Sequence, residues 1–261
     1  MLMEMQFPDL RQTFIADPGY QLFDIDLAGA DARVVAWEAD DEDLMDAFES
    51  GINVHIKNAK DAFPDITQIE LEKHKGNLKE SYLYDRIKRA VHATNYGAVP
   101  ATLATKCSWS LRQAEDFQAL WLYKLHPAIL DWHERTEYEI QTEGRTRNAL
   151  GDSIDWFSRP DKPTWRKALA WCPQSTVAGV AMEAQIIIDD KLPEVEFLSQ
   201  VHDSLLFQIQ TSKVTRILRQ VKDVLDNIIV PYPRPLIIPW EMKTGHRSWG
   251  LCKKTDWSEL L

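Results

Sequence analysis

The chain lacks paired cysteines, long apolar runs and an excess of positive charge. Its three cysteines, Cys107, Cys172 and Cys252, are widely spaced and form no C-x-x-C pair, which argues against a disulfide framework or a structural zinc site. No run of about eighteen apolar residues is present to cross a membrane, and the first residues lack the basic and apolar parts of a secretory signal. These absences predict a cytoplasmic protein without a membrane partner.

The formal net charge is −10 at pH 7, so a general electrostatic grip on nucleic acid is not expected. The charge is spread unevenly along the chain. Residues 38–49 contain seven acidic residues and no basic one, a pattern typical of a solvated helical face. Residues 71–89 contain six basic and three acidic residues, and this stretch is suited to facing phosphate groups.

The 261 residues, 44% of them hydrophobic, suffice for a sizeable core in one or two globular units. Strand patterns occur near both ends of the chain, and helical patterns fill its middle. This arrangement predicts an α+β fold with a small, mainly antiparallel sheet built from both ends. The expected strands are 10–14, 20–27, 194–201, 205–209 and 236–242; the expected helices are 30–48, 54–63, 82–96, 111–124, 129–141, 164–191 and 213–229, with a hairpin at 144–152.

Two short acidic motifs lie far apart in the sequence. Asp26 ends the first apolar strand in Phe23-Asp24-Ile25-Asp26-Leu27, and Asp203 lies at or near the turn of a predicted hairpin in Val201-His202-Asp203-Ser204-Leu205. Between them, the 3.6-residue period of the helix 82–96 places Lys88, His92 and Tyr96 on one face and apolar residues on the other. We expect the apolar face to pack and the other to face a cleft.

Taken in their order along the chain, the segments around Asp26, Lys88 and Asp203 resemble motifs A, B and C of the family A DNA polymerases, the bacterial polymerase I type found also in many phages. The resemblance extends from about Leu10 to Trp249. It implies a right-hand polymerase fold, with a palm from residues 1–37 and 160–261 and helical fingers from residues 38–159. Only about 25 residues precede motif A, so the thumb and the 3′→5′ exonuclease domain of such enzymes are expected to be absent.

The resemblance implies that Asp26 and Asp203 are catalytic carboxylates that hold two Mg²⁺ ions, with Mn²⁺ as the alternative. Two such ions about 4 Å apart can activate the primer hydroxyl and stabilise the leaving pyrophosphate, and Mg²⁺ prefers oxygen ligands. Leu27 is implied as a further metal- and nucleotide-binding position. Asp24 is the alternative ligand to Asp26.

The same resemblance implies that the helix around Lys88 binds the incoming dNTP. Lys88 would hold the triphosphate and protonate the pyrophosphate, while Tyr96, followed by Gly97, matches the family's tyrosine and glycine. His92 stands where the family has an aromatic ring. Tyr84 replaces an arginine, for which Arg86 or Arg89 could substitute.

Motif A places Asp31 where the family has a glutamate that helps the tyrosine exclude a 2′-hydroxyl. The shorter acid puts ribonucleotide rejection in question, and the alternative for Asp31 is an acid facing a helix dipole. DNA contacts are implied for Arg33, Arg166, Gln174 and His202. Two further positions depart from the family, because Ala170 replaces an asparagine and Ser204 a glutamate, whereas the segment Gly245–Trp249 resembles its closing stretch.

The sequence therefore predicts a template-directed DNA polymerase acting on primer-template DNA and dNTPs in a bacterial or phage-infected cell. The expected form is the catalytic half of a split or truncated phage-type enzyme, completed by a partner that carries the thumb and could carry an exonuclease. Two alternatives stay open: a catalytically silent module that binds DNA or a replication partner, and a metal-dependent nuclease that uses Asp24 with Asp26.

Overall fold

The computed structural model describes residues 9–65, 67, 84–157 and 159–261. The start of the predicted helix 82–96 and most of the basic stretch 71–89 lie outside these residues. The chain divides into two compact units. We call Met1–Ala30 with Thr176–Leu261 the sheet unit, and Asp31–Ser175 the helical unit. The palm and fingers boundaries after residues 37 and 159 stay predictions.

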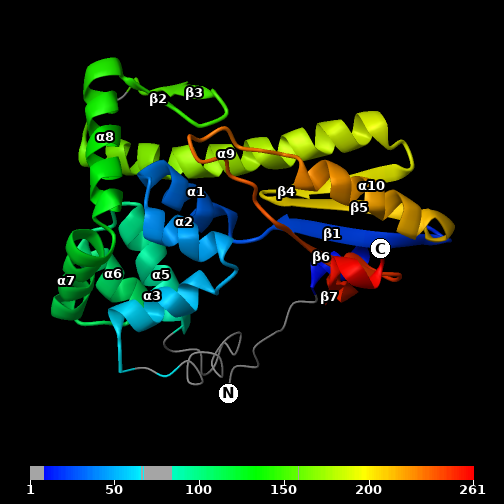
Figure 1. Ribbon diagram of the computed structural model, residues 1–261, viewed down its shortest axis with the longest axis horizontal. Helices are drawn as coiled ribbons and strands as arrows, with labels where there is room; N and C mark the ends of the chain where they lie inside the picture. Colours follow the sequence, from blue (N-terminus) through cyan, green and yellow to red (C-terminus); the bar gives the residue numbers. More distant parts are fainter. Residues whose placement is uncertain (1–8, 66, 68–83, 158) are drawn as a thin grey trace. The chain divides into compact units, whose positions relative to one another are not determined.

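The sheet unit is built on a five-stranded antiparallel sheet in the order β4-β5-β1-β6-β7 (Figure 1). Its central strand comes from the start of the chain and its four other strands from the end, which confirms the predicted assembly of the sheet from both ends of the chain. The strands are β1 (Tyr20–Leu27), β4 (Val195–Val201), β5 (Ser204–Gln210), β6 (Trp240–Gly245) and β7 (Lys253–Thr255).

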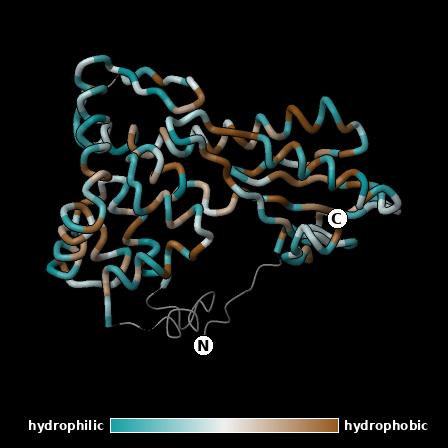
Figure 2. Tube along the Cα trace, in the orientation of Figure 1, coloured by the Kyte–Doolittle hydropathy of each residue, from teal (hydrophilic) through white to brown (hydrophobic). Residues whose placement is uncertain are grey.

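Apolar side chains fill the sheet unit from both sides of β1. Leu22, Phe23 and Ile25 are fully buried, and the Phe23 ring stacks on Phe207 of β5 with 5.6 Å between ring centroids. Hydrophobic residues run along these strands in Figure 2. Helix α10 (Val214–Asp226) contacts β5 and buries a stripe at helical spacing, consisting of Val214, Ile217, Leu218, Val221 and Leu225.

The helical unit packs short helices around the indole of Trp121, which is fully buried. Side-chain caps begin several of them: Asp41 caps α2, Asn53 caps α3 and Ser110 forms a capping box on α7. The helices are α1 (Ala30–Ala39), α2 (Glu42–Glu49), α3 (Val54–Ala62), α5 (Tyr84–Asn95), α6 (Pro100–Cys107), α7 (Leu111–Leu120), a π-helical turn (Trp121–Leu125) and α8 (Pro127–Glu143), followed by the hairpin β2 (Arg145–Arg147) and β3 (Ser153–Asp155). The division between the units falls within α9 (Lys162–Lys191).

Several predicted elements were wrong. The segment predicted as a strand at 10–14 is a 3₁₀ helix, Leu10–Thr13, because the Asp9 side chain accepts from the Arg11 amide and starts a turn. The predicted helix 30–48 is two helices, since Asp40 takes a left-handed conformation (φ 56°) and Asp41 caps the next helix. Helix α6 and strand β7 were missed.

The last predicted strand, 236–242, is displaced to Trp240–Gly245. Prolines at 231, 233, 235 and 239 carry no amide hydrogen and cannot donate to a ladder. In this stretch only an isolated bridge, Val230 to Leu236, forms among the described residues. Pairing with β1 therefore begins only after the last of these prolines.

Candidate active site

The sheet places the two predicted catalytic aspartates together. Asp26 lies one residue before the end of β1, opposite Ser204 on β5 and Glu241 on β6. The next amide, that of Leu27, donates to the carbonyl of Asp203 at 3.2 Å. This hydrogen bond joins the end of β1 to the turn between β4 and β5, which is where the sequence placed Asp203.

The turn itself depends on His202, whose φ is 56°. A left-handed residue lets the chain reverse within two residues and leaves Asp203 as the first side chain before β5. His202 is exposed and Asp203 is half-buried. The geometry thus presents Asp203, at the turn before β5, beside the end of β1 that carries Asp26, as a metal site would require.

Burial raises the pKa of Asp26, and the nearby carboxylates of Asp24, Glu241 and Asp203 raise it further, while Lys243 opposes them. The Lys243 ammonium lies 3.7 Å from Asp26 Oδ1 and 3.9 Å from Asp24 Oδ2. Asp26 Oδ1 is buried and accepts no hydrogen bond within the described part of the chain. An unsatisfied carboxylate oxygen amid several acids suits a hard divalent cation.

Asp24 differs from Asp26 because its oxygens are already hydrogen-bonded. Oδ1 accepts from the Ser204 hydroxyl at 3.0 Å, and Oδ2 accepts from the Trp249 indole at 2.9 Å. Asp24 is also buried. Ser204 replaces the expected glutamate, and Trp249 belongs to the closing stretch. Through these contacts both residues help to fix the strand that carries Asp24. They favour Asp26 over Asp24 as a ligand.

Leu27 has a buried, apolar side chain and an amide already used by Asp203. Only its carbonyl oxygen could take part in the metal or nucleotide binding that the resemblance implies.

In the helical unit, α5 has the two faces that its period predicts. Ile87, Ala90, Val91 and Thr94 are buried, whereas Lys88 and His92 are exposed. Tyr96 follows the last residue of the helix and is partly buried. The predicted nucleotide-facing side chains therefore share one accessible side.

Tyr96, Asp31 and His92 form one contact network. The Tyr96 hydroxyl donates a short hydrogen bond to Asp31 Oδ1, and His92 Nε2 lies 3.2 Å from Asp31 Oδ2. Burial, followed by the Asp31 charge, strongly raises the pKa of Tyr96, so its hydroxyl stays a donor. Asp31 thus contacts Tyr96, the tyrosine that the resemblance to the family A motifs implies as its partner.

A cavity of about 430 Å³ opens beside this network. It is lined by His92, Ala93, Tyr96, Ala98, Val99, Thr102, Lys106 and Arg166. Two cations, a tyrosine and an imidazole at one cavity suit a ligand that is both anionic and aromatic. The structure thus brings Arg166 of α9 to the predicted nucleotide residues of α5.

Gly97 is required where α5 ends. Its φ is +67°, and a Cβ at this position would lie 2.6 Å from ring atoms of Trp165, the neighbour of Arg166. Such a separation is shorter than real contacts allow, so only glycine lets α9 approach.

Arg33, Gln174 and Tyr84 do not line this cavity. Arg33 stacks on the Phe48 ring with 4.7 Å to the centroid, and burial lowers its pKa. Gln174 is exposed on α9. Tyr84 is buried with its ring edge against His55, so it packs rather than replacing an arginine at the surface.

A second group of possible metal ligands, which sequence reasoning missed, consists of Asp41, Asp43 and His126, whose ligating atoms lie within 4.8 Å of one another. Each already has a protein partner. Asp41 caps α2 and lies 2.9 Å from His126 Nδ1, while Asp43 pairs with Lys57. The group is explained as a packing contact between the starts of α2 and α8.

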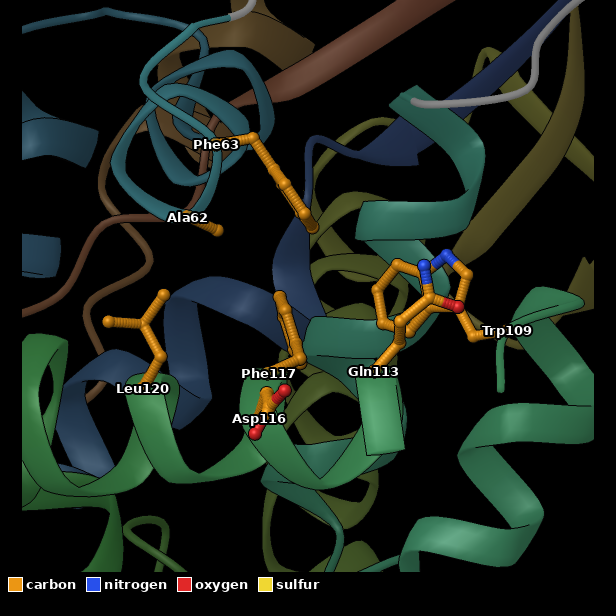
Figure 3. A pocket seen from close by; sticks show the side chains of 7 residues that line it. All are labelled: Ala62, Phe63, Trp109, Gln113, Asp116, Phe117 and Leu120. Atoms are coloured by element: carbon orange, nitrogen blue, oxygen red, sulfur yellow. The ribbon is translucent and has the colours of Figure 1, made fainter. Parts of the chain in front are cut away.

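An aromatic pocket of about 260 Å³ also lies in the helical unit, and its lining is shown in Figure 3. Phe63, Trp109 and Phe117 surround it, with Asp116 and Gln113 at its polar side. None of the predicted site residues lines it.

Comparison with known sequences identifies the family. A sequence profile of DNA polymerase family A matches residues 3–250, nearly the whole chain. The chain belongs to DNA polymerase family A.

The curated family A relatives are distant in sequence and much longer. DNA polymerase I of Rhizobium leguminosarum is 26% identical over 234 residues, covering 85% of this chain and 22% of the relative. The thermostable DNA polymerase I of Thermus filiformis is 24% identical over 253 residues, covering 92% of this chain and 28% of the relative. The chain therefore spans only about a quarter of the length of these relatives.

A solved family A structure has the same fold. The POL domain of Pol1 from M. smegmatis, in complex with DNA primer-template and dNTP, matches with a TM-score of 0.77 and 22% identity. The match covers 93% of this chain and 42% of that structure. It confirms the α+β polymerase-domain fold predicted from the sequence.

In this family A chain, sequence reasoning missed Lys243 and Lys106. Lys243 pairs with Asp24 across β1 and β6, but the predicted strand ended one residue earlier. Lys106 lies in α6, a helix that was not predicted; the signal was Pro100 at its first turn. None of the helices in the described ranges combines the length and apolar character needed to cross a bilayer.

Proposed function

We propose that this chain catalyses template-directed addition of deoxynucleotides to a DNA primer. The observation that carries the proposal is the junction of β1 with the β4–β5 turn, which brings Asp26 beside Asp203 and leaves Asp26 Oδ1 without a hydrogen bond. Membership of DNA polymerase family A supports this chemistry over others.

In this proposal Asp26, Asp203 and the Leu27 carbonyl hold two divalent cations, Mg²⁺ or Mn²⁺. Such ions supply Lewis-acid activation of the primer hydroxyl and charge neutralisation at the phosphate. The protein residues fix the geometry around them. Lys243 limits the repulsion among the carboxylates, and Ser204 with Trp249 holds Asp24 in place.

The exposed face of α5 binds the incoming dNTP in the same proposal. Lys88 contacts the triphosphate and donates a proton to the departing pyrophosphate, while Tyr96 and His92 contact the sugar and base. Arg166, at the same cavity, and Gln174, Arg33 and His202 contact primer-template DNA. In these terms the sheet unit contributes to a palm and the helical unit to fingers.

We further propose that a thumb-bearing polypeptide completes a phage-type split enzyme in the cytoplasm. The net charge of −10 supports this, because a duplex grip rests on clustered basic residues. Addition of a thumb fragment should then raise primer extension strongly. An unchanged extension rate would contradict the split-enzyme part alone.

The second candidate is a silent DNA- or replisome-binding module. Its support is Tyr84, which is buried where the family has an arginine. A nuclease that uses Asp24 with Asp26 has less support, since both oxygens of Asp24 already accept hydrogen bonds, from Ser204 and Trp249.

Primer extension on a DNA template with dNTPs and Mg²⁺ tests the proposal. Wild type should extend the primer, Asp203→Ala should reduce extension by at least about a hundredfold, and Asp223→Ala, an exposed acid on α10, should not. Equal activity of the two variants would contradict the proposed catalytic role. A nuclease centred on Asp24 and Asp26 would instead survive Asp203→Ala.

A further inference from the structure

A lysine side chain lies at the proposed metal site. Lys243 of β6 is directly opposite Asp24 of β1, and its ammonium lies 3.7 Å from Asp26 Oδ1 and 3.9 Å from Asp24 Oδ2. Asp26 Oδ1 is the buried oxygen that accepts no hydrogen bond from the described residues. The oxygen best suited to bind a divalent cation therefore already faces a cation of the protein.

The contact of Lys243 with these carboxylates depends on charge rather than on hydrogen bonds. A hydrogen bond between an ammonium and a carboxylate is about 2.7–2.9 Å long, and both distances to Lys243 are longer. Lys254, which lies opposite Lys243 on β7, approaches Glu241 Oε2 at 2.7 Å, within this range. Lys243 can therefore leave Asp26 without breaking a hydrogen bond, whereas Lys254 is held at its partner.

The surroundings also give the Lys243 ammonium another position. Its side chain is 39% exposed, and lysine carries a compact charge on a flexible stem. Asp24 is a second carboxylate within reach, and its hydrogen bonds come from neutral donors, Ser204 and Trp249, which leave its negative charge in place. The ammonium can therefore move from Asp26 toward Asp24 or toward solvent while the backbone of β6 stays paired.

We infer that Lys243 is a resident counter-ion of the metal site, which holds the carboxylates together in the metal-free protein and competes there with the divalent cation. This inference rests on the proposed metal-dependent function. Without metal, Lys243 offsets the repulsion of Asp26 by Asp24 and Asp203. Two positive charges at one oxygen repel each other, so Lys243 must withdraw from Asp26 Oδ1 before this oxygen can bind a cation. Lys243 thus lowers the metal affinity of the site.

Calorimetric titration of the full chain with Mn²⁺, without DNA or nucleotide, tests this role. Lys243→Met removes the charge but keeps most of the side-chain length, and it should bind Mn²⁺ roughly tenfold more tightly than wild type. Lys243→Arg keeps the charge and should bind no more tightly than wild type. Lys254→Met is the matched control, because it removes a cation that pairs with Glu241 instead of Asp26; its affinity should change less than about threefold.

Thermal unfolding gives a second readout, which changes in the opposite direction. Without metal, Lys243→Met should unfold at a lower temperature than wild type, because the carboxylates lose their counter-charge. Saturating Mn²⁺ should raise its unfolding temperature more than that of wild type. General damage to the fold would instead lower both the stability and the metal affinity. Adding Asp203→Ala should abolish the gain in affinity, which assigns it to this site.

An unchanged or weaker Mn²⁺ affinity in Lys243→Met, an equal gain in Lys254→Met, or a gain that persists with Asp203→Ala would overturn the inference. None of these measurements requires DNA synthesis. A wild-type chain that binds Mn²⁺ but extends no primer would contradict the polymerase proposal and leave the role of Lys243 intact. Conversely, primer extension together with an unchanged affinity in Lys243→Met would overturn the role of Lys243 alone.

Discussion

Burial and three neighbouring carboxyl groups disfavour the charged form of Asp26. Metal ligands are often arranged in this way, since the charge that destabilises the free protein stabilises the bound cation. Asp24, two residues earlier, is the internal comparison, because its hydrogen bonds come from Ser204 and Trp249. β1 therefore carries two different aspartates: Asp24 has a structural role, and Asp26 is available for binding.

Asp26→Asn should stabilise the metal-free protein at pH 7. The folded-state pKa of Asp26 is raised, so stability is lost as pH rises from the ordinary aspartate pKa through the folded value. The side chain is about one-third exposed, which limits the gain to about 1 kcal/mol or less. Urea unfolding at several pH values measures it. The gain should vanish below the ordinary aspartate pKa; destabilisation at pH 7 would contradict the argument.

At the scale of elements, several residues of the candidate site lie at the ends of helices. Tyr96 and Gly97 lie where α5 ends, and Asp31 lies in the first turn of α1. The close approach of Trp165 to Gly97 and the hydrogen bond from Tyr96 to Asp31 fix these positions, rather than the helical period. Substitutions there should affect stability more than their exposure suggests.

Gly97→Ala should destabilise the protein by about 3 kcal/mol. A left-handed conformation costs a residue with a Cβ about 1 kcal/mol, and the approach to Trp165 adds an overpacking cost of about 2 kcal/mol. Gly151→Ala is the control, because its φ is +92° but no atom lies within 4 Å of the added Cβ. Equal losses in chemical denaturation would show that the Trp165 contact adds nothing.

Asp41→Ala should cost about 2 kcal/mol of unfolding free energy. It removes the cap of α2 and leaves the buried His126 ring without its partner. Asn53→Ala removes the cap of α3 and the longer, 3.5 Å hydrogen bond from the Tyr84 hydroxyl, and it should cost about 1 kcal/mol. Thermal denaturation of both variants gives the comparison. If Asp41→Ala lost no more stability than Asn53→Ala, the pair with His126 would contribute nothing to stability.

Periodicity was enough to predict β1, the two faces of α5 and the β4–β5 hairpin. It failed between 231 and 239, where the apolar residues have strand-like content but the prolines cannot join a ladder. The contacts of Asp31 with His92 and Tyr96, and of Asp41 with His126, could not be predicted. They join residues 61 to 85 positions apart through packing that local pattern does not encode.

At the scale of the whole molecule, cation binding should be linked to folding. A cation bound only by the folded sheet unit raises the unfolding temperature as its concentration increases. Addition of Mn²⁺ should therefore raise the unfolding temperature of wild type and have a much smaller effect on Asp203→Ala. Equal shifts in a thermal scan would place the binding elsewhere, for example at Asp41, Asp43 and His126.

The central position of β1 also has a consequence for how the protein is made. Asp24 on β1 hydrogen-bonds to Ser204 on β5, and 180 residues separate them. At ribosomal speeds of about 5–20 residues per second, β1 waits roughly 10–40 s for that neighbour. During this interval the apolar side chains of Leu22, Phe23 and Ile25 have no β5 or β6 to pack beside. The central strand of the sheet is therefore made first and can complete its pairing only after β5 and β6 have been synthesised.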